Sequence, residues 1–386
     1  MTPRAAHLLP ILLAGCDATA PSTHTEPSPE GFDELYDAGS TRFLDAIEPR
    51  LQAEADGVLT FGFDANAGPA CLDGGPYNVT ARDAGGADLI IYLQPGGACW
   101  SETCLSISAV FPGLPPIDIV DAANPLNPLA DWNVVYGPYC DGSLFAGDAE
   151  DPERGRTFAG LANLSAVIAT ARERFPNPSR VLFAGSSAGG YGTIHGMPLV
   201  RAAFPEAPIY ILNDSGGGIA RDADPGFLDL LLDEWNATGL VPASCEGCLS
   251  EGHLTPLIDW QLQRDPLLRV GVFGSTADYV ISNLFLRVDG ESGYGEPLLA
   301  QTAAVHRVHP SRFQRFIISG QQHTSLVGDV AAVIGAEASE LSVLFAGLEI
   351  GGLDTEAEDG TTMADWVDAL VNQGPEWTSK LPAGRQ

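Results

Sequence analysis

The chain has 386 residues, 45% of them hydrophobic and 18% charged, which is the composition of a folded globular protein rather than a disordered or fibrous one. Fifty acidic residues against nineteen basic ones give a formal net charge of −31. A surface this negative repels phosphate backbones, so we expect no nucleic-acid partner.

The N-terminus has the pattern of an exported lipoprotein. Arg4 precedes the apolar run HLLPILLAG, which has the length of a signal-peptide core and is too short to span a bilayer. The run ends in LAGC, which resembles a bacterial lipobox with Cys16 as the lipidated residue. Residues 17–30 are rich in Pro, Ser, Thr and acids and are typical of a flexible tether. An ordinary cleaved signal peptide is the alternative.

Beyond the tether, strand-type and helix-type segments alternate along the chain. Residues 32–51 predict one or two entry helices, residues 160–175 carry apolar side chains at helical spacing, and residues 363–373 predict a final amphipathic helix. Apolar runs predict strands at 87–93, 132–137, 179–185, 208–214, 268–274 and 312–319. This alternation predicts an α/β fold with a mainly parallel sheet and helices on both faces.

The segment GSSAG, residues 185–189, fits the pattern G-x-S-x-G with Ser187 at its centre. It follows a predicted strand and precedes a predicted helix, which is the context of a nucleophile elbow. Ser187 is therefore the candidate nucleophile, and the backbone N–H of Ala188 would face the developing oxyanion. Gly96 and Gly97, in the loop after the first predicted strand, offer further backbone donors.

A serine nucleophile needs a base and an orienting acid. His323 follows the last predicted strand, where an α/β-hydrolase places its base, and Asp278 follows the strand before it. Asp214, at the end of the strand over 208–214, is the alternative acid, and could instead cap the glycine-rich turn beside it. Trp100 and Tyr139 are candidate pocket residues. This chemistry requires no metal and no organic cofactor.

The stretches YLQPGGACWSETC, VVYGPYCDGSLFAGD, GSSAGG and NDSGGG, with the surroundings of Asp278 and His323, resemble the pectin acetylesterase family, which includes the Notum carboxylesterases. The resemblance spans about residues 87–326. It implies an α/β-hydrolase-like fold, a triad of Ser187, Asp278 and His323, and an oxyanion hole of Gly96, Gly97 and Ala188. Pro95 stands where relatives often have glycine, and no bulky aromatic residue follows the glycine pair, so the long acyl pocket of Notum is not carried over.

Six cysteines remain after Cys16, an even number that favours disulfides in an exported protein. Cys245 and Cys248 form CEGC, which lacks the partner ligands of a zinc site and is read as a local disulfide. The family resemblance implies that Cys99 pairs with Cys104 and Cys71 with Cys140, and leaves Cys245 with Cys248.

We therefore predict three parts: a lipoprotein signal peptide over residues 1–16, a tether over 17–30 and one catalytic domain over 31–386. The domain is expected to be a monomeric serine carboxylesterase that hydrolyses short acyl esters, including acetyl groups on a glycan, through a covalent acyl-enzyme. It would be exported and held by its lipid anchor in the periplasm or at the cell surface, or secreted if the lipobox is not used. The alternatives are a lipase, polyester depolymerase or peptidase on the same fold, and a non-catalytic surface-binding lipoprotein.

Overall fold

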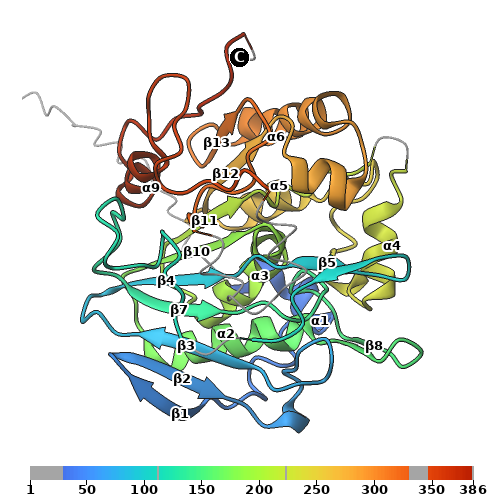
Figure 1. Ribbon diagram of the computed structural model, residues 1–386, viewed down its shortest axis with the longest axis vertical. Helices are drawn as coiled ribbons and strands as arrows, with labels where there is room; N and C mark the ends of the chain where they lie inside the picture. Colours follow the sequence, from blue (N-terminus) through green and yellow to red (C-terminus); the bar gives the residue numbers. More distant parts are fainter. Residues whose placement is uncertain (1–28, 111–112, 222–223, 330–346, 385–386) are drawn as a thin grey trace, which may run out of the picture.

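The computed structural model describes residues 29–110, 113–221, 224–329 and 347–384 (Figure 1). The signal peptide, Cys16 and most of the tether lie outside these residues. Within the described residues, none of the helices has the length and apolar character needed to cross a membrane.

A sheet of nine strands forms the centre of the molecule. Its order is β1-β2-β3-β7-β4-β10-β11-β12-β13, and Figure 1 shows the strands stacked from β1 at the bottom to β13 at the top. Six neighbouring strands are parallel: β7 (Asn133–Gly137), β4 (Asp88–Leu93), β10 (Arg180–Ser186), β11 (Ile209–Asp214), β12 (Arg269–Ser275) and β13 (Phe313–Ile318). These are the six strands that the sequence predicts, so the mainly parallel sheet is confirmed.

Three strands at one edge are antiparallel and were not predicted. They are β1 (Arg50–Ala55), β2 (Val58–Gly62) and β3 (Asn78–Arg82), and β3 joins the parallel part through β7. The expected entry helix shrinks to α1 (Asp33–Asp37) followed by turns. Gly39 adopts a φ of +87°, which ends regular helix there. Two hairpins, β5 (Gly97–Cys99) with β6 (Cys104–Ser106) and β8 (Ala149–Asp151) with β9 (Arg156–Phe158), lie outside the main sheet.

Helices cover both faces of the sheet, as predicted. Alternate residues of β4 point to opposite cores: Leu89 and Ile91 join one apolar cluster, and Ile90 joins the other. The first cluster includes side chains of α2 (Gly160–Arg174), α3 (Ala188–Ala203), α4 (Phe227–Glu234), α5 (Thr255–Arg264) and α6 (Glu296–Val308). The second is closed by α9 (Met363–Asn372), the predicted final helix.

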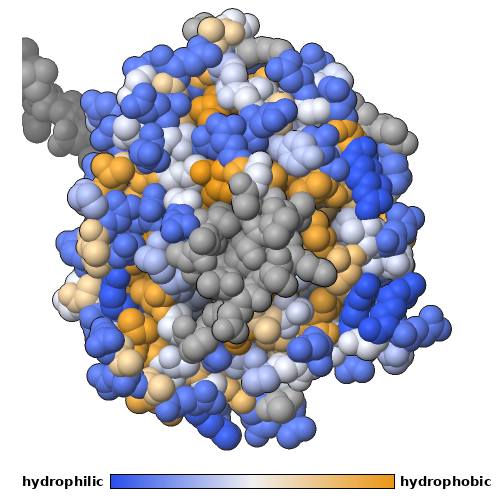
Figure 2. All heavy atoms as spheres, viewed as in Figure 1, coloured by the Kyte–Doolittle hydropathy of each residue, from blue (hydrophilic) through white to orange (hydrophobic). Residues whose placement is uncertain are grey.

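Three disulfides crosslink the described residues. Outside the grey area of Figure 2, the face shown carries mainly hydrophilic side chains, with smaller hydrophobic areas between them. The implied disulfide pairings are confirmed as Cys71–Cys140, Cys99–Cys104 and Cys245–Cys248. The second of these joins the hairpin β5–β6, which follows β4 directly and so lies at the carboxyl edge of the sheet.

Candidate active site

Ser187 is the single residue between a strand and a helix. β10 ends at Ser186 and α3 begins at Ala188. Ser187 has φ 53° and ψ −114°, a strained conformation that non-glycine residues rarely adopt. A Cβ atom on Gly189 would lie 2.1 Å from the Leu93 carbonyl oxygen. The small residues of the motif therefore allow the helix to approach the strands closely enough to form this turn.

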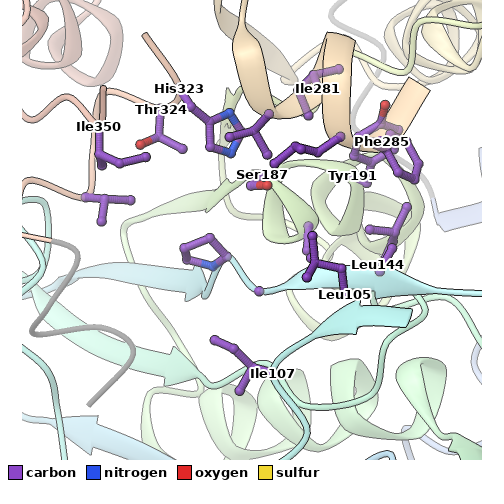
Figure 3. Close-up of a pocket in the computed structure, with 18 of the residues that line it drawn as sticks. Leu105, Ile107, Leu144, Ser187, Tyr191, Ile281, Phe285, His323, Thr324 and Ile350 are labelled. Carbon is purple, nitrogen blue, oxygen red and sulfur yellow. The ribbon is translucent and has the colours of Figure 1, made fainter. Parts of the chain in front are cut away.

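His323 and Asp278 form a buried pair beside Ser187. The His323 Nδ1–H donates to the Asp278 carboxylate, with distances of 2.8 Å to Oδ2 and 3.0 Å to Oδ1. The carboxylate can only accept, so Nδ1 carries the proton and Nε2 is left as the basic atom. The Ile281 N–H, 3.0 Å from Oδ1, fixes the carboxylate further. Figure 3 shows the His323 ring facing the Ser187 hydroxyl.

Asp214 takes neither of the two roles considered for it. No hydrogen bond joins its side chain to His323 among the described contacts, because its oxygens accept from Ser186 Oγ at 2.5 Å and from the Ser325 N–H at 2.8 Å. The glycine-rich turn is capped by Asn213 instead, whose Oδ1 accepts from the Gly216 N–H at 3.0 Å. The geometry thus places Asp278, and not Asp214, against the histidine.

Gly96, Gly97 and Ala188 line the same pocket as Ser187 and His323. Ala188 is the first residue of α3, so its N–H belongs to the donors that a helix leaves without intrahelical partners. Gly97 has a φ of +83°, and a Cβ there would lie 2.0 Å from the Leu105 carbonyl oxygen, so only glycine fits. Donors of this kind can stabilise an oxyanion next to the serine.

Of the two predicted pocket residues, Trp100 lines the pocket and Tyr139 does not. Tyr139 is fully buried behind Gly96, where a Cβ would lie 2.1 Å from its ring. Its hydroxyl oxygen accepts from the Leu144 N–H at 3.0 Å. Tyr139 follows the end of β7, and its side chain points into the core. It therefore packs behind the glycine loop and does not enter the pocket.

The pocket wall is mostly apolar, and the sequence did not reveal most of it. One side comes from the π-helical turn η4 (Val280–Leu286), which begins two residues after Asp278. Tyr191 lies one helical turn after Ser187 on α3, and this spacing could have identified it. Figure 3 shows Ile281 and Phe285 on one side of Ser187 and Leu105 and Ile107 on the other. The apolar and aromatic lining residues other than glycine are Pro95, Ala98, Trp100, Leu105, Ile107, Leu144, Ala188, Tyr191, Val280, Ile281, Leu284, Phe285, Val327 and Ile350.

Metal-ligating side chains do not gather here: across the described parts of the chain, no three His, Cys, Asp or Glu side chains come together as a metal site. The polar side chains that line the pocket are Ser187, His323, Thr103 and Thr324.

Residues 52–222 match the family model described as pectinacetylesterase. The predicted resemblance is thereby confirmed for this region, which contains Gly96, Gly97, Ser187 and Ala188. Asp278 and His323 lie beyond the pectinacetylesterase match, and only the geometry links them to Ser187.

Two curated relatives agree with the match. The chain is 27% identical to pectin acetylesterase 11 of Arabidopsis thaliana over 166 residues, which are 39% of this chain and 42% of the relative. It is 28% identical to palmitoleoyl-protein carboxylesterase notum2 of Xenopus laevis over 173 residues, which are 41% of this chain and 35% of the relative. The chain thus spans about two fifths of the length of the relatives it matches.

Proposed function

We propose that this chain is a serine carboxylesterase that hydrolyses short acyl esters through a covalent acyl-enzyme. The observation that carries the proposal is the orientation of His323: its Nδ1 is held by Asp278 at 2.8 Å while its ring faces Ser187 in a strained turn. A surface-binding lipoprotein without activity would not need this arrangement. The pectinacetylesterase match supports the same reading.

The mechanism follows from the positions of these groups. Ser187 Oγ attacks the ester carbonyl while His323 Nε2 takes its proton, and Asp278 stabilises the imidazolium. The N–H groups of the glycine loop and of Ala188 hold the oxyanion. The intermediate collapses, the alcohol leaves with the proton from Nε2, and Ser187 remains acylated. A water molecule, deprotonated by His323, then attacks the acyl-enzyme; the imidazolium returns that proton to Ser187 Oγ as the bond to the acyl group breaks and the acid leaves.

The pocket favours a short apolar acyl group. Its cavity has a volume of about 70 Å³, roughly five times the ~15 Å³ that one water molecule requires. Its walls carry few polar groups apart from those of the proposed chemistry, so a charged or strongly hydrated acyl group would lose its hydration there. We propose acetyl to about hexanoyl groups as the acyl part. A glycan hydroxyl is the first alcohol part to test, as in an acetylated glycan, because one relative is named a pectin acetylesterase.

The same apolar wall favours a second candidate over a peptidase. An esterase for longer aliphatic acyl chains or for polyesters would use the same triad and an apolar pocket. Initial rates on p-nitrophenyl esters from acetate to dodecanoate, and on acetylated pectin and xylan, separate these functions. The proposal predicts rates that peak at short chains and vanish in Ser187→Ala. A peak at dodecanoate would favour the second candidate, and equal rates for wild type and Ser187→Ala would refute both.

We also propose that the chain is exported and anchored through a lipid on Cys16. Three disulfides support an oxidising compartment outside the cytoplasm. Expression with radiolabelled palmitate should label the wild-type chain and leave Cys16→Ala unlabelled. Equal labelling of both chains would contradict the anchor.

A further inference from the structure

The carboxylate of Asp214 is a buried anion that the proposed chemistry does not use. It stands at the carboxyl end of β11, in register with Ser186 of β10, and its side chain has no exposed surface. Burial raises its pKa to about 6, although the hydrogen bond from Ser186 and the charge of His323 oppose this rise. Burying a carboxylate costs free energy unless hydrogen bonds or a paired charge compensate for its lost hydration.

Asp214 joins the nucleophile turn to the loop that carries the histidine. Its backbone oxygen accepts from the Ser187 N–H at 2.7 Å. Its side chain accepts from the Ser325 N–H at 2.8 Å and from the Leu326 N–H at 3.3 Å. The next residue, Ser215, accepts from the Thr324 N–H at 3.0 Å. Three consecutive amides directly after His323 are thus held by two adjacent residues at the end of β11.

The strand side of Asp214 is also fixed. Ser186 Oγ donates to Asp214 Oδ2 at 2.5 Å and lies 2.8 Å from the Tyr92 hydroxyl. Tyr92 belongs to β4, whose end contacts the nucleophile elbow at Gly189. Asp214 is therefore connected to the central strands on one side and to the histidine loop on the other.

We propose that Asp214 is a positioning residue: it sets the loop of His323 against the Ser187 turn and supplies a second negative charge to the imidazolium that forms during turnover. This inference rests on the proposed function. The direct contact of the ring remains Asp278, so Asp214 acts on His323 through the loop and through its charge.

Three tyrosine hydroxyls lie near the two carboxylates: Tyr92 interacts with Asp214, and Tyr191 and Tyr294 interact with Asp278. Glu349, whose backbone oxygen accepts from the His323 N–H at 2.7 Å, is exposed to solvent. Burial raises the pKa of each tyrosine above its usual range, so all three stay neutral at working pH. Removing the charge of Asp214 should consequently make the imidazolium less stable.

The test uses the full chain and the pH profile of kcat/KM on p-nitrophenyl acetate. In Asp214→Asn the amide oxygen can still accept from the Ser325 N–H, but the amide nitrogen cannot accept from Ser186 Oγ or from the Leu326 N–H, so the loop of His323 loses one of its contacts. We expect kcat to fall by about 10- to 100-fold with KM little changed, because only the reacting geometry is disturbed. The acid limb of the profile should move to lower pH by about one unit, because a nearby opposite charge has been lost.

Two further variants keep the result decisive. Asp141→Asn removes another buried carboxylate, which bonds Ser143 and makes no contact with the histidine loop, and its acid limb should match the wild type. Ser186→Ala removes a bond that helps to keep Asp214 ionised, so Asp214 takes up its proton at higher pH and activity should begin to fall at higher pH. This second variant decides the matter if Asp214→Asn does not fold.

A folded Asp214→Asn with wild-type kcat and acid limb would overturn the proposal, and so would a Ser186→Ala profile identical to that of the wild type. A shift of the acid limb in Asp141→Asn equal to that in Asp214→Asn would also overturn it, since the effect would then belong to any buried charge. Failure of the proposed function looks different: the wild type would then show no hydrolysis that depends on Ser187.

Discussion

Gly189 is the glycine on which the nucleophile turn depends most directly, and Gly189→Ala tests why. A Cβ at this position would lie 2.1 Å from the carbonyl oxygen and 2.7 Å from the carbonyl carbon of Leu93. These are backbone atoms of β4, a strand paired on both sides by β7 and β10. The strand cannot retreat without breaking that pairing, so the helix must move.

The magnitude follows from two opposing terms. Alanine favours a helix over glycine by about 1 kcal/mol. Overpacking costs about 1–3 kcal/mol when side chains can adjust, and the contact here is with backbone, which places the cost at the upper end of that range. We expect a net loss of about 2 kcal/mol in the free energy of unfolding. A displacement of the turn by about 1 Å should lower kcat/KM about 100-fold.

Gly192→Ala is the matched control on the same helix. Its Cβ would meet only side-chain atoms, Leu93 Cδ1 at 2.7 Å and Phe145 Cδ2 at 2.9 Å, which can adjust. Urea unfolding followed by tryptophan fluorescence, with initial rates on p-nitrophenyl acetate, compares the two variants. A Gly189→Ala variant with the urea midpoint and the hydrolysis rate of the wild type would show that the contact with Leu93 does not constrain the turn. A lower midpoint and rate in Gly192→Ala than in Gly189→Ala would show the same.

Three other variants test the site and the fold. Asp278→Asn should lower kcat by about 10⁴-fold in steady-state kinetics, because the histidine would no longer be held as the correct tautomer; a loss below tenfold would contradict its role. Burial raises the pKa of Asp141 to about 6, so the folded chain binds this proton more tightly than the unfolded chain and the free energy of unfolding falls as pH rises from about 4 to about 6. The free energy of unfolding of Asp141→Asn minus that of the wild type should therefore increase by roughly 2 to 3 kcal/mol between pH 4 and pH 7 in urea titrations. A difference that does not change with pH would contradict this. Replacing both Cys71 and Cys140 by alanine opens a crosslink of sequence separation 69 and should cost about 4 kcal/mol in the same assay, whereas an unchanged midpoint would show that the crosslink does not stabilise the fold.

The sequence predicted the parts of the fold where one physical rule dominates. Strands buried on both faces are continuous apolar runs, and all six parallel strands were located on that basis. The edge strand β1 was missed because it is exposed along its whole length and carries polar residues. Asp56-Gly57, with φ of 52° and 77°, forms a two-residue hairpin turn and was the signal that could have revealed β1 and β2.

The site was predictable where chemistry restricts residue types and not where packing alone decides. Ser187 and His323 could be chosen because a strand–turn–helix motif and a loop after the last strand define their places. Tyr139 was expected in the pocket, but its position depends on how the loop after β7 turns toward Gly96. The contacts of Asp214 join residues more than 100 positions apart, such as Ser325, and no local pattern predicts them.

The most direct test of the central claim is the mass of the chain after reaction with a fluorophosphonate, which forms a stable ester with an activated serine. Peptide mapping should place one label on Ser187 in the wild type and in Ser186→Ala, and none in Ser187→Ala. Ester hydrolysis should disappear in proportion to labelling. A label that persists in Ser187→Ala, or hydrolysis that survives complete labelling, would show that Ser187 is not the nucleophile.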